Sequence, residues 1–287
     1  MSAPEPVALT ASVRLEWPAF AAGRLLRRLT GASVGLIVPL LALAAWQASA
    51  MGGWLPPQVL PSPAEVTALL LAMLESGELR DHTLISLSRV AWGFGLGAAG
   101  GLALGVLMGL SRRVEETVNP LFVALAQIPP LGWVPLLIML VGIDEALKVL
   151  VIAKAAFVPL AINTLKGIRA VPPHFVEVGR VFGFGPWPML TRVVLPAAVP
   201  PIFTGVRYAM THAWLALVAV ELLASSEGLG YLMVWGRQLF QLETVLVAMA
   251  AVGLIGYLLD RALAGVEARL QRWRQIGAGE VGAGGAA

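Results

Sequence analysis

The chain has 287 residues, of which 58% are hydrophobic and 13% are charged, and its mean hydropathy is +0.80. Soluble domains average roughly 25% charged residues, so this composition excludes an ordinary soluble protein and indicates a polytopic membrane protein. The net charge is only +3, and the lack of cysteine excludes disulfides and thiolate metal sites.

The N-terminal region joins a basic tail to an apolar run. Residues 1–30 are either a basic amphipathic helix on the membrane surface, over about 13–29, or a disordered tail. Residues 31–50 contain no charged residue and are long enough to cross a hydrocarbon core of about 30 Å. Ala48-Ser49-Ala50 imitates a signal-peptide cleavage site, but the long tail and the full-length apolar run favour an uncleaved first span.

A short helix outside the membrane precedes the second span. The prolines between 56 and 63 predict an extended entry, followed by a helix from Ser62 to about Ser76. The second span covers 86–110, where glycine recurs at seven positions. Small residues at such spacings let helices approach closely in lipid, so we expect a packing face, with a hinge as the alternative.

The third and fourth spans each contain an unusual feature. The third, 118–142, is interrupted by Pro129-Pro130 and Pro135. Such breaks are tolerated where neighbours or water satisfy the freed backbone groups, so this span is either a pathway-lining helix with Gln127 as a polar contact or a merely kinked helix. The fourth, 146–165, contains Lys154. A lysine inside a span costs about 2.5–3.5 kcal/mol, so it needs water, a partner or room to snorkel.

The 166–201 segment is polar and lies between two apolar spans. It carries four basic residues and one acidic residue, Glu177. Prolines bound it at both ends, and Gly183 to Pro186 breaks its centre. This pattern predicts two short helices outside the membrane, joined by a tight turn.

The fifth and sixth spans, 202–223 and 244–263, complete a transmembrane region of 31–265, followed by a C-terminal tail over 266–287. Polar residues inside a span are functional candidates by default, although those near an interface can simply snorkel or pair. The candidates for the translocation pathway are Gln127, Lys154, Arg207, His212 and Glu221.

Basic residues indicate the orientation of the chain. Six spans place both termini on one side, together with the 166–201 segment and the arginines at 112–113. Few basic residues fall on the opposite side. Because basic residues concentrate in cytoplasmic loops, we expect both termini and the 166–201 segment to be cytoplasmic.

Motifs for several enzyme classes are absent from the sequence. It contains no Gly-x-x-x-x-Gly-Lys-Ser/Thr phosphate loop, no Gly-x-Ser-x-Gly elbow and no His-Glu-x-x-His zinc motif. We therefore expect no catalytic residue, no metal site, no cofactor bound to this chain and no nucleic-acid partner. Transport and membrane scaffolding remain, with energy supplied by another protein if transport is uphill.

The 166–201 segment also contains a recognisable motif. Glu177-Val178-Gly179, then Gly183, then Val193-Val194-Leu195-Pro196 resembles the "EAA" signature of ABC importer permeases. The spacing matches that signature, while Val178 and Gly179 replace its two alanines and Val193 replaces its isoleucine. These departures keep small or apolar character.

The resemblance extends over most of the chain, from about Leu60 to Arg274. Several short motifs look like the nitrate/sulfonate/taurine branch of these permeases: Leu60-Pro-Ser-Pro63, Gly109-Leu-Ser-Arg112, Ile128-Pro-Pro130, Asn163-Thr164, Leu195-Pro-Ala-Ala198, Thr204-Gly-Val-Arg207 and Gly228-Leu-Gly-Tyr231. The resemblance does not identify the solute.

The resemblance implies an all-α fold of about six transmembrane helices in the type I ABC importer permease architecture. It implies an inner-membrane homodimer, a cytoplasmic ABC ATPase dimer that binds ATP and Mg²⁺, and a periplasmic or lipid-anchored solute-binding protein. The transported solute would be a small anion such as nitrate, a sulfonate, taurine or bicarbonate, carried by alternating access.

In that family a short coupling helix docks into the ATPase. The residues implied for this loop are Glu177, Val178, Gly179, Gly183, Leu195 and Pro196. Glu177 would favour the start of the helix and pair with the partner, and Gly179 and Gly183 would allow close approach and a turn. Leu195-Pro196 would end the second helix and tie it rigidly to the fifth span. The alternative function is an ion-driven secondary transporter without an ATPase partner.

Overall fold

The computed structural model describes residues 37–53, 56 and 60–270, which form helices and turns without a strand. The all-helical fold is therefore confirmed for the described part of the chain. The chain divides into two compact units, Met1–Pro57 and Gln58–Ala287. In the first unit the described helix is Ile37–Met51. The predicted tail over 1–30 lies outside the described residues.

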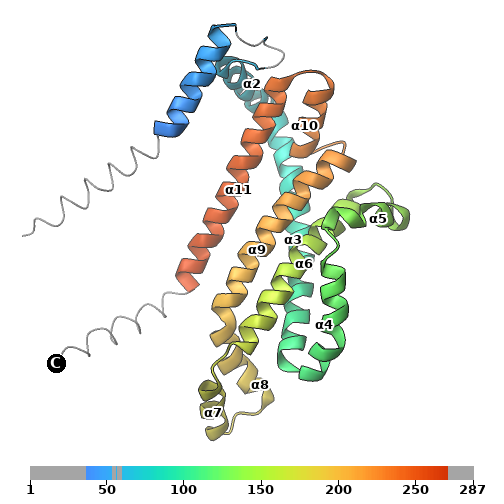
Figure 1. Cartoon of the computed structure of the whole chain (residues 1–287), viewed down its shortest axis with the longest axis vertical. Helices are drawn as coiled ribbons and strands as arrows, with labels where there is room; N and C mark the ends of the chain where they lie inside the picture. Colours follow the sequence, from blue (N-terminus) through green and yellow to red (C-terminus); the bar gives the residue numbers. More distant parts are fainter. Residues whose placement is uncertain (1–36, 54–55, 57–59, 271–287) are drawn as a thin grey trace, which may run out of the picture. The chain divides into compact units, whose positions relative to one another are not determined.

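Long helices of the second unit run side by side (Figure 1). They are α3 (Glu78–Leu110), α6 (Glu145–Arg169), α9 (Leu195–Ala224) and α11 (Leu242–Leu270). They contain the predicted spans 86–110, 146–165, 202–223 and 244–263, in that order. The α6 helix packs against both α3 and α9, and its buried residues include Leu147, Ile152 and Leu160. The core of the unit therefore lies around α6.

Glycines on every fourth position of α3 face α6. An ideal Cβ on Gly97 would lie 2.2 Å from the Ala153 carbonyl oxygen, and one on Gly101 would lie 2.5 Å from the Phe157 carbonyl oxygen. Gly93, Gly105 and Gly109 meet α6 in the same way. These positions recur at i and i+4 and so share one helix face. The expectation of a packing face is confirmed, and the helices approach closely because that face lacks side chains.

The predicted third span is not one straight helix. The α4 helix (Arg112–Ala126) ends before Pro129, and the 3₁₀ helix η1 (Pro130–Trp133) leads into α5 (Val134–Val141). The two halves are bent by 91°. Pro129 and Pro130 lack backbone N–H groups, which explains why the helical ladder stops at this point.

We predicted six spans, but fewer of the described helices are long and apolar enough to cross a membrane. Among the described residues, α3, the continuous helix Pro186–Ala224 and α11 are long and apolar enough to cross a membrane, and the bent pair would be a fourth. Ile37–Met51 is a shorter apolar helix, whose preceding residues are not described. The number six therefore stays a prediction.

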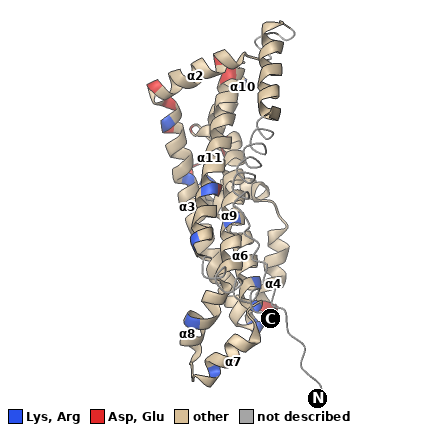
Figure 2. Ribbon diagram, turned by 90° about the vertical axis from the view of Figure 1, so that its left-hand side faces the viewer, with Lys and Arg blue, Asp and Glu red and all other residues tan. Residues whose placement is uncertain are grey.

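The two ends of the second unit carry different short helices (Figure 1). At one end lie α7 (Pro173–Val181) and α8 (Pro186–Met189). At the opposite end lie α2 (Pro63–Ser76) and α10 (Leu229–Gln238). The α2 helix begins where predicted, because Ser62 and Glu65 form a reciprocal capping box. Basic residues lie on α7 (Arg180) and in the helical turn that follows α8 (Arg192), whereas acidic residues lie near α2 (Figure 2).

Candidate functional site

The 166–201 segment forms two helical pieces around a tight turn. Gly179 of α7 is buried, and an ideal Cβ on it would lie 2.9 Å from the Met189 sulfur. Gly183 adopts a left-handed backbone with φ +71° and has open space around it. The glycines therefore provide a close approach and a sharp turn, as their positions predicted.

The second helical piece does not end at Leu195-Pro196, so that expectation is wrong. The α8 helix continues through a π-helical turn, η2 (Leu190–Val194), directly into α9. Pro196 lies in the first turn of α9, where a backbone N–H would have little or no role in the helical hydrogen bonding. The second helical piece is consequently the start of the continuous helix Pro186–Ala224, so its direct connection to the fifth span agrees with the expectation.

The turn between α7 and α8 exposes apolar side chains. Val181 is 86% exposed, Phe182 73% and Trp187 72%. Glu177 and Val178 are also exposed on α7. Beneath α7 a hollow of about 980 Å³ is lined mainly by apolar residues, among them Phe175, Val178, Pro196 and Pro200. The 166–201 segment therefore presents an apolar surface, and its single carboxylate is Glu177.

The predicted pathway residues do not gather in one place. Lys154 donates to the carbonyl oxygen of Ile128, at the break between α4 and η1. Gln127 is exposed at the same break. Arg207 pairs with Asp260 at 2.8 Å and Glu267 at 2.9 Å on α11. His212 is exposed, and its Nδ1 lies 2.8 Å from the carbonyl oxygen of Tyr208 in its own helix.

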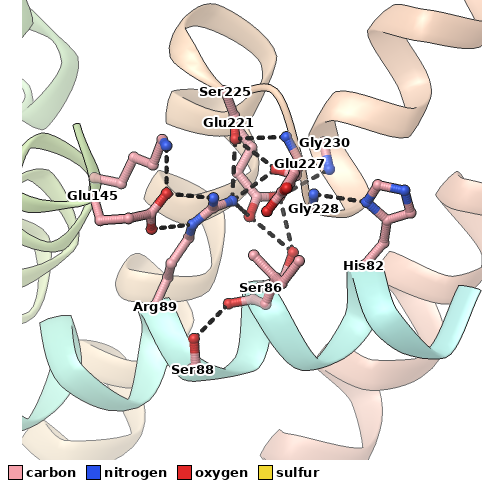
Figure 3. Close-up of polar contacts among 12 residues, drawn as sticks. His82, Ser86, Ser88, Arg89, Glu145, Glu221, Ser225, Glu227, Gly228 and Gly230 are labelled. Carbon is pink, nitrogen blue, oxygen red and sulfur yellow. Dashed lines mark hydrogen bonds and ion pairs between the residues drawn. The ribbon is translucent and has the colours of Figure 1, made fainter. Parts of the chain in front are cut away.

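Glu221, by contrast, is at the centre of a buried polar cluster (Figure 3). Its side chain is fully buried and accepts hydrogen bonds from Ser86 Oγ at 2.8 Å and from Arg89 Nη1 at 2.7 Å. The backbone N–H of Gly230 donates to its second oxygen at 2.9 Å. We call this group, completed by Glu145 and Lys148, the Arg89 cluster.

Arg89 connects the helices of the cluster. Its Nε and Nη2 donate to both carboxylate oxygens of Glu145, at 2.7 and 2.6 Å. Its Nη1 also donates to Ser225 Oγ and to the Glu227 carbonyl oxygen. Arg89 thus joins α3, the first residue of α6, the end of α9 and the following turn. With its side chain only 3% exposed and its donors occupied, Arg89 is not placed to receive a ligand anion.

The charges of the Arg89 cluster balance. Arg89 and Lys148 each bond to Glu145, and these bonds hold the pKa of Glu145 at about 2 although partial burial opposes them. Glu145 is therefore ionised at any physiological pH. Two cations and two carboxylates offset one another, which is required of buried ionic groups. No group of acidic or histidine side chains within 37–53, 56 and 60–270 is arranged to hold a metal ion.

The sequence did not reveal Arg89, Ser86 or Glu145 as partners of Glu221. Arg89 and Glu221 are 132 positions apart in the chain. The available signal was topological: with alternating spans, the start of α3, the start of α6 and the end of α9 fall on one side of the membrane. Charges of opposite sign at those three ends are the pattern that could have suggested the cluster.

Similarity to known proteins decides the family. The family described as "Binding-protein-dependent transport system inner membrane component" matches residues 101–272, more than half of the chain. The aliphatic sulfonates transport permease protein SsuC of Bacillus subtilis is 39% identical over 86% of this chain and 90% of its own length. The chain belongs to this family.

Further relatives agree with this assignment. The bicarbonate transport system permease protein CmpB of Synechococcus elongatus is 37% identical to this permease over 71% of the chain and 74% of its own length. A chain of the MetNI methionine ABC transporter shares the fold with a TM-score of 0.59 at 18% identity, over 68% of this permease and 97% of that chain. The predicted type I ABC importer architecture is confirmed.

The permease is an inner-membrane component of an ABC importer, as the motif in the 166–201 segment predicted. The sulfonate-type branch is also confirmed, and the ion-driven secondary transporter finds no support among these relatives. The family match begins at residue 101, so it contains Glu221 but not Arg89. The matched region therefore contains only one member of the buried Arg89–Glu221 ion pair.

Replacement of Gly228 by alanine should destabilise the permease through the Arg89 cluster. Gly228 has φ +106°, and an ideal Cβ on it would lie 2.3 Å from the Glu221 carboxylate. The backbone strain costs about 1–3 kcal/mol, and the overlap costs about 1–3 kcal/mol more. Thermal unfolding of the purified protein in detergent measures the loss.

Gly77→Ala is the control for a positive φ without a contact, and its backbone is left-handed with ψ −5°, whereas Gly228 has ψ 173°. Gly77 also has a positive φ, +83°, but no atom lies within 4 Å of its ideal Cβ. It therefore reports backbone strain alone. Equal destabilisation by the two substitutions would show that contact with Glu221 is not important.

Proposed function

We propose that this permease is the membrane-spanning subunit of an ATP-driven importer of a small anion, with a sulfonate or bicarbonate as the candidate solute. The names of its relatives support this class, since they include permeases for aliphatic sulfonates and for bicarbonate. Transport proceeds by alternating access, in which ATP binding by a partner biases a two-state helix bundle. The chain itself performs no chemistry.

The 166–201 segment is the docking element for a separate ATPase dimer. The observation that carries this proposal is the exposure of Val178, Val181 and Phe182 beside the single carboxylate of Glu177. Exposed apolar patches with a polar rim mark protein interaction sites. ATP and Mg²⁺ would bind to that partner, because this sequence lacks a phosphate loop.

The remaining assembly follows from orientation. The basic residues Arg180 of α7 and Arg192 of η2 (Figure 2) support a cytoplasmic location for that end of the molecule, with both termini on the same side. Two copies of the permease form the pathway within the lipid bilayer. A periplasmic or lipid-anchored solute-binding protein delivers the anion to the opposite end, near α2 and α10.

Charge reversal at Glu177 should detach the ATPase. Glu177→Lys and Val181→Asp each change an exposed side chain, so the fold should persist while the docking surface loses its charge or its apolar character. We expect each variant to reduce the amount of co-purified ATPase at least tenfold. Affinity purification of the tagged permease, co-expressed with its candidate ABC ATPase, measures this amount.

Glu116→Lys serves as the control for Glu177→Lys. Glu116 is exposed, forms only an exposed ion pair with Arg112 and lies on the same predicted side of the membrane. It should retain the ATPase. Retention after both Glu177→Lys and Val181→Asp would mean that the segment is not the docking element.

The energy source is tested separately. Proteoliposomes that contain the permease, its ATPase and its binding protein should accumulate the anion only when ATP is present on the side of the bilayer that carries the ATPase. Accumulation driven by an ion gradient without ATP would favour the secondary transporter instead.

A further inference from the structure

Lys154 differs from the other cations within the helix bundle. Arg89, Lys148 and Arg207 each lie within 3 Å of a carboxylate oxygen. Lys154 has no carboxylate partner in the part of the chain that the structure describes, and its Nζ bonds only to the carbonyl oxygen of Ile128. The charge of Lys154 is therefore uncompensated among the described residues of one copy of the permease.

The position of Lys154 along α6 would give its charge a high free-energy cost in the hydrocarbon core. It lies nine residues after the start of the helix, or about 14 Å at the rise of an α-helix, in a helix about 38 Å long. Its side chain is only half-buried. An ammonium that faced lipid tails at such a depth would cost about 2.5–3.5 kcal/mol. Lys154 is thus expected to face water or a counter-charge rather than lipid.

The surroundings of Lys154 offer further hydrogen-bond donors. Ile128 lies in the break between α4 and η1, and the adjacent Gln127 is exposed with no hydrogen bond from its side-chain amide to any described residue. The η1 turn packs against α6 and contains Trp133, whose buried indole N–H has no acceptor among the described residues. Broken helices near the middle of a membrane protein form the ion and substrate sites of many transporters.

We propose that Lys154 and the amide of Gln127 form a subsite for a small oxyanion in the translocation pathway. This inference rests on the proposed function and deepens it, because it places the anion at the break between α4 and η1. The ammonium supplies the charge that a sulfonate or bicarbonate needs, and the amide supplies a second N–H donor. The bond to Ile128 orients the lysine and leaves its two other protons for the anion.

A purely structural role for Lys154 is the competing explanation. In that case the lysine only satisfies a carbonyl at the open end of α4. Lys154→Gln separates the two roles, because glutamine can donate to the Ile128 carbonyl but has no charge. Lys154→Arg keeps the charge. Arg261→Met is the control, since it removes one positive charge from an exposed position of α11 that has a ring contact with Tyr257 but no ion pair to any described residue.

The test uses the complete transporter in proteoliposomes, with ethanesulfonate and bicarbonate as separate probes. We expect Lys154→Gln to reduce uptake of the transported probe at least tenfold, Lys154→Arg to keep a substantial part of it, and Arg261→Met to match the wild type. ATPase co-purification and basal ATP hydrolysis should be equal in all four proteins, because the docking segment is unchanged.

Three other outcomes would contradict either the Lys154 subsite or the proposed solutes. Full uptake by Lys154→Gln would overturn the subsite, and so would dissociation of the complex by Lys154→Gln, which would show that the lysine pairs with the second copy. Uptake of neither probe by the wild-type complex would instead overturn the sulfonate and bicarbonate candidates of the proposed function.

Discussion

Replacement of Gly97 by leucine is expected to prevent the helix bundle from assembling, whereas the same change at Gly95 should be tolerated. An ideal Cβ on Gly97 would lie 2.2 Å from the backbone oxygen of Ala153, which cannot move without shifting α6. Overpacking by single groups in a core already costs about 1–3 kcal/mol, and leucine adds four carbons where no space exists. Gly95, two residues away, has no atom within 4 Å of its ideal Cβ.

The two variants form a matched pair, because they make the same change on the same helix. Yield and monodispersity of the detergent-solubilised permease measure assembly, and thermal unfolding measures what remains. We expect Gly97→Leu to give little folded protein and Gly97→Ala to fall between it and the wild type. A monodisperse Gly97→Leu protein with wild-type stability would show that α3 and α6 do not pack as closely as the structure shows.

The α3–α6 contact illustrates what the sequence contains and what it does not. Glycines at four-residue spacing predict a smooth face, because the spacing fixes which positions share a side of the helix. The same spacing does not predict which helix packs against this face, since any helix can do so. That α6 is the partner depends on tertiary contacts between residues about 56 positions apart, such as Gly97 and Ala153.

Proline positions were informative in the same limited way. Pro129-Pro130 predicted the interruption of the third span, because each proline removes a backbone donor. The bend of 91° was not predictable, since its direction is set by packing on neighbouring helices. At Leu195-Pro196 the same reasoning failed: a proline in the first turn of a helix removes no bond that the helix needs, and the π-helical turn before it keeps the chain helical.

The intramembrane charges were harder still to interpret. Glu221 and Arg207 were both named as pathway candidates, and for both the structure supplies nearby partners, Arg89 for the first and Asp260 and Glu267 for the second. A sequence shows that a charge needs a partner but not which one, because Coulomb attraction depends on distance in space. Lys154 remains a pathway candidate because it has no charged partner among the residues that the structure describes.

The second large effect is expected at Arg89. Arg89→Met leaves the fully buried carboxylate of Glu221 without its cation, and it also removes the two hydrogen bonds from Arg89 to Glu145. Loss of one member of a buried ion pair costs about 3–5 kcal/mol, because the other charge stays desolvated. Arg112→Met is the matched control: its pair with Glu116 has side chains that are 83% and 64% exposed, so it should cost about 0–1 kcal/mol.

A double-mutant cycle on Arg89 and Glu221 identifies the cause of this loss. If the uncompensated carboxylate is responsible, Arg89→Met combined with Glu221→Leu should be more stable than Arg89→Met alone, because no buried charge is then left unpaired. Glu221→Leu alone should cost less than Arg89→Met, since Arg89 retains Glu145 and the carbonyl of Glu227. Additive losses in thermal unfolding would argue against a direct interaction and leave only the packing contribution of each side chain.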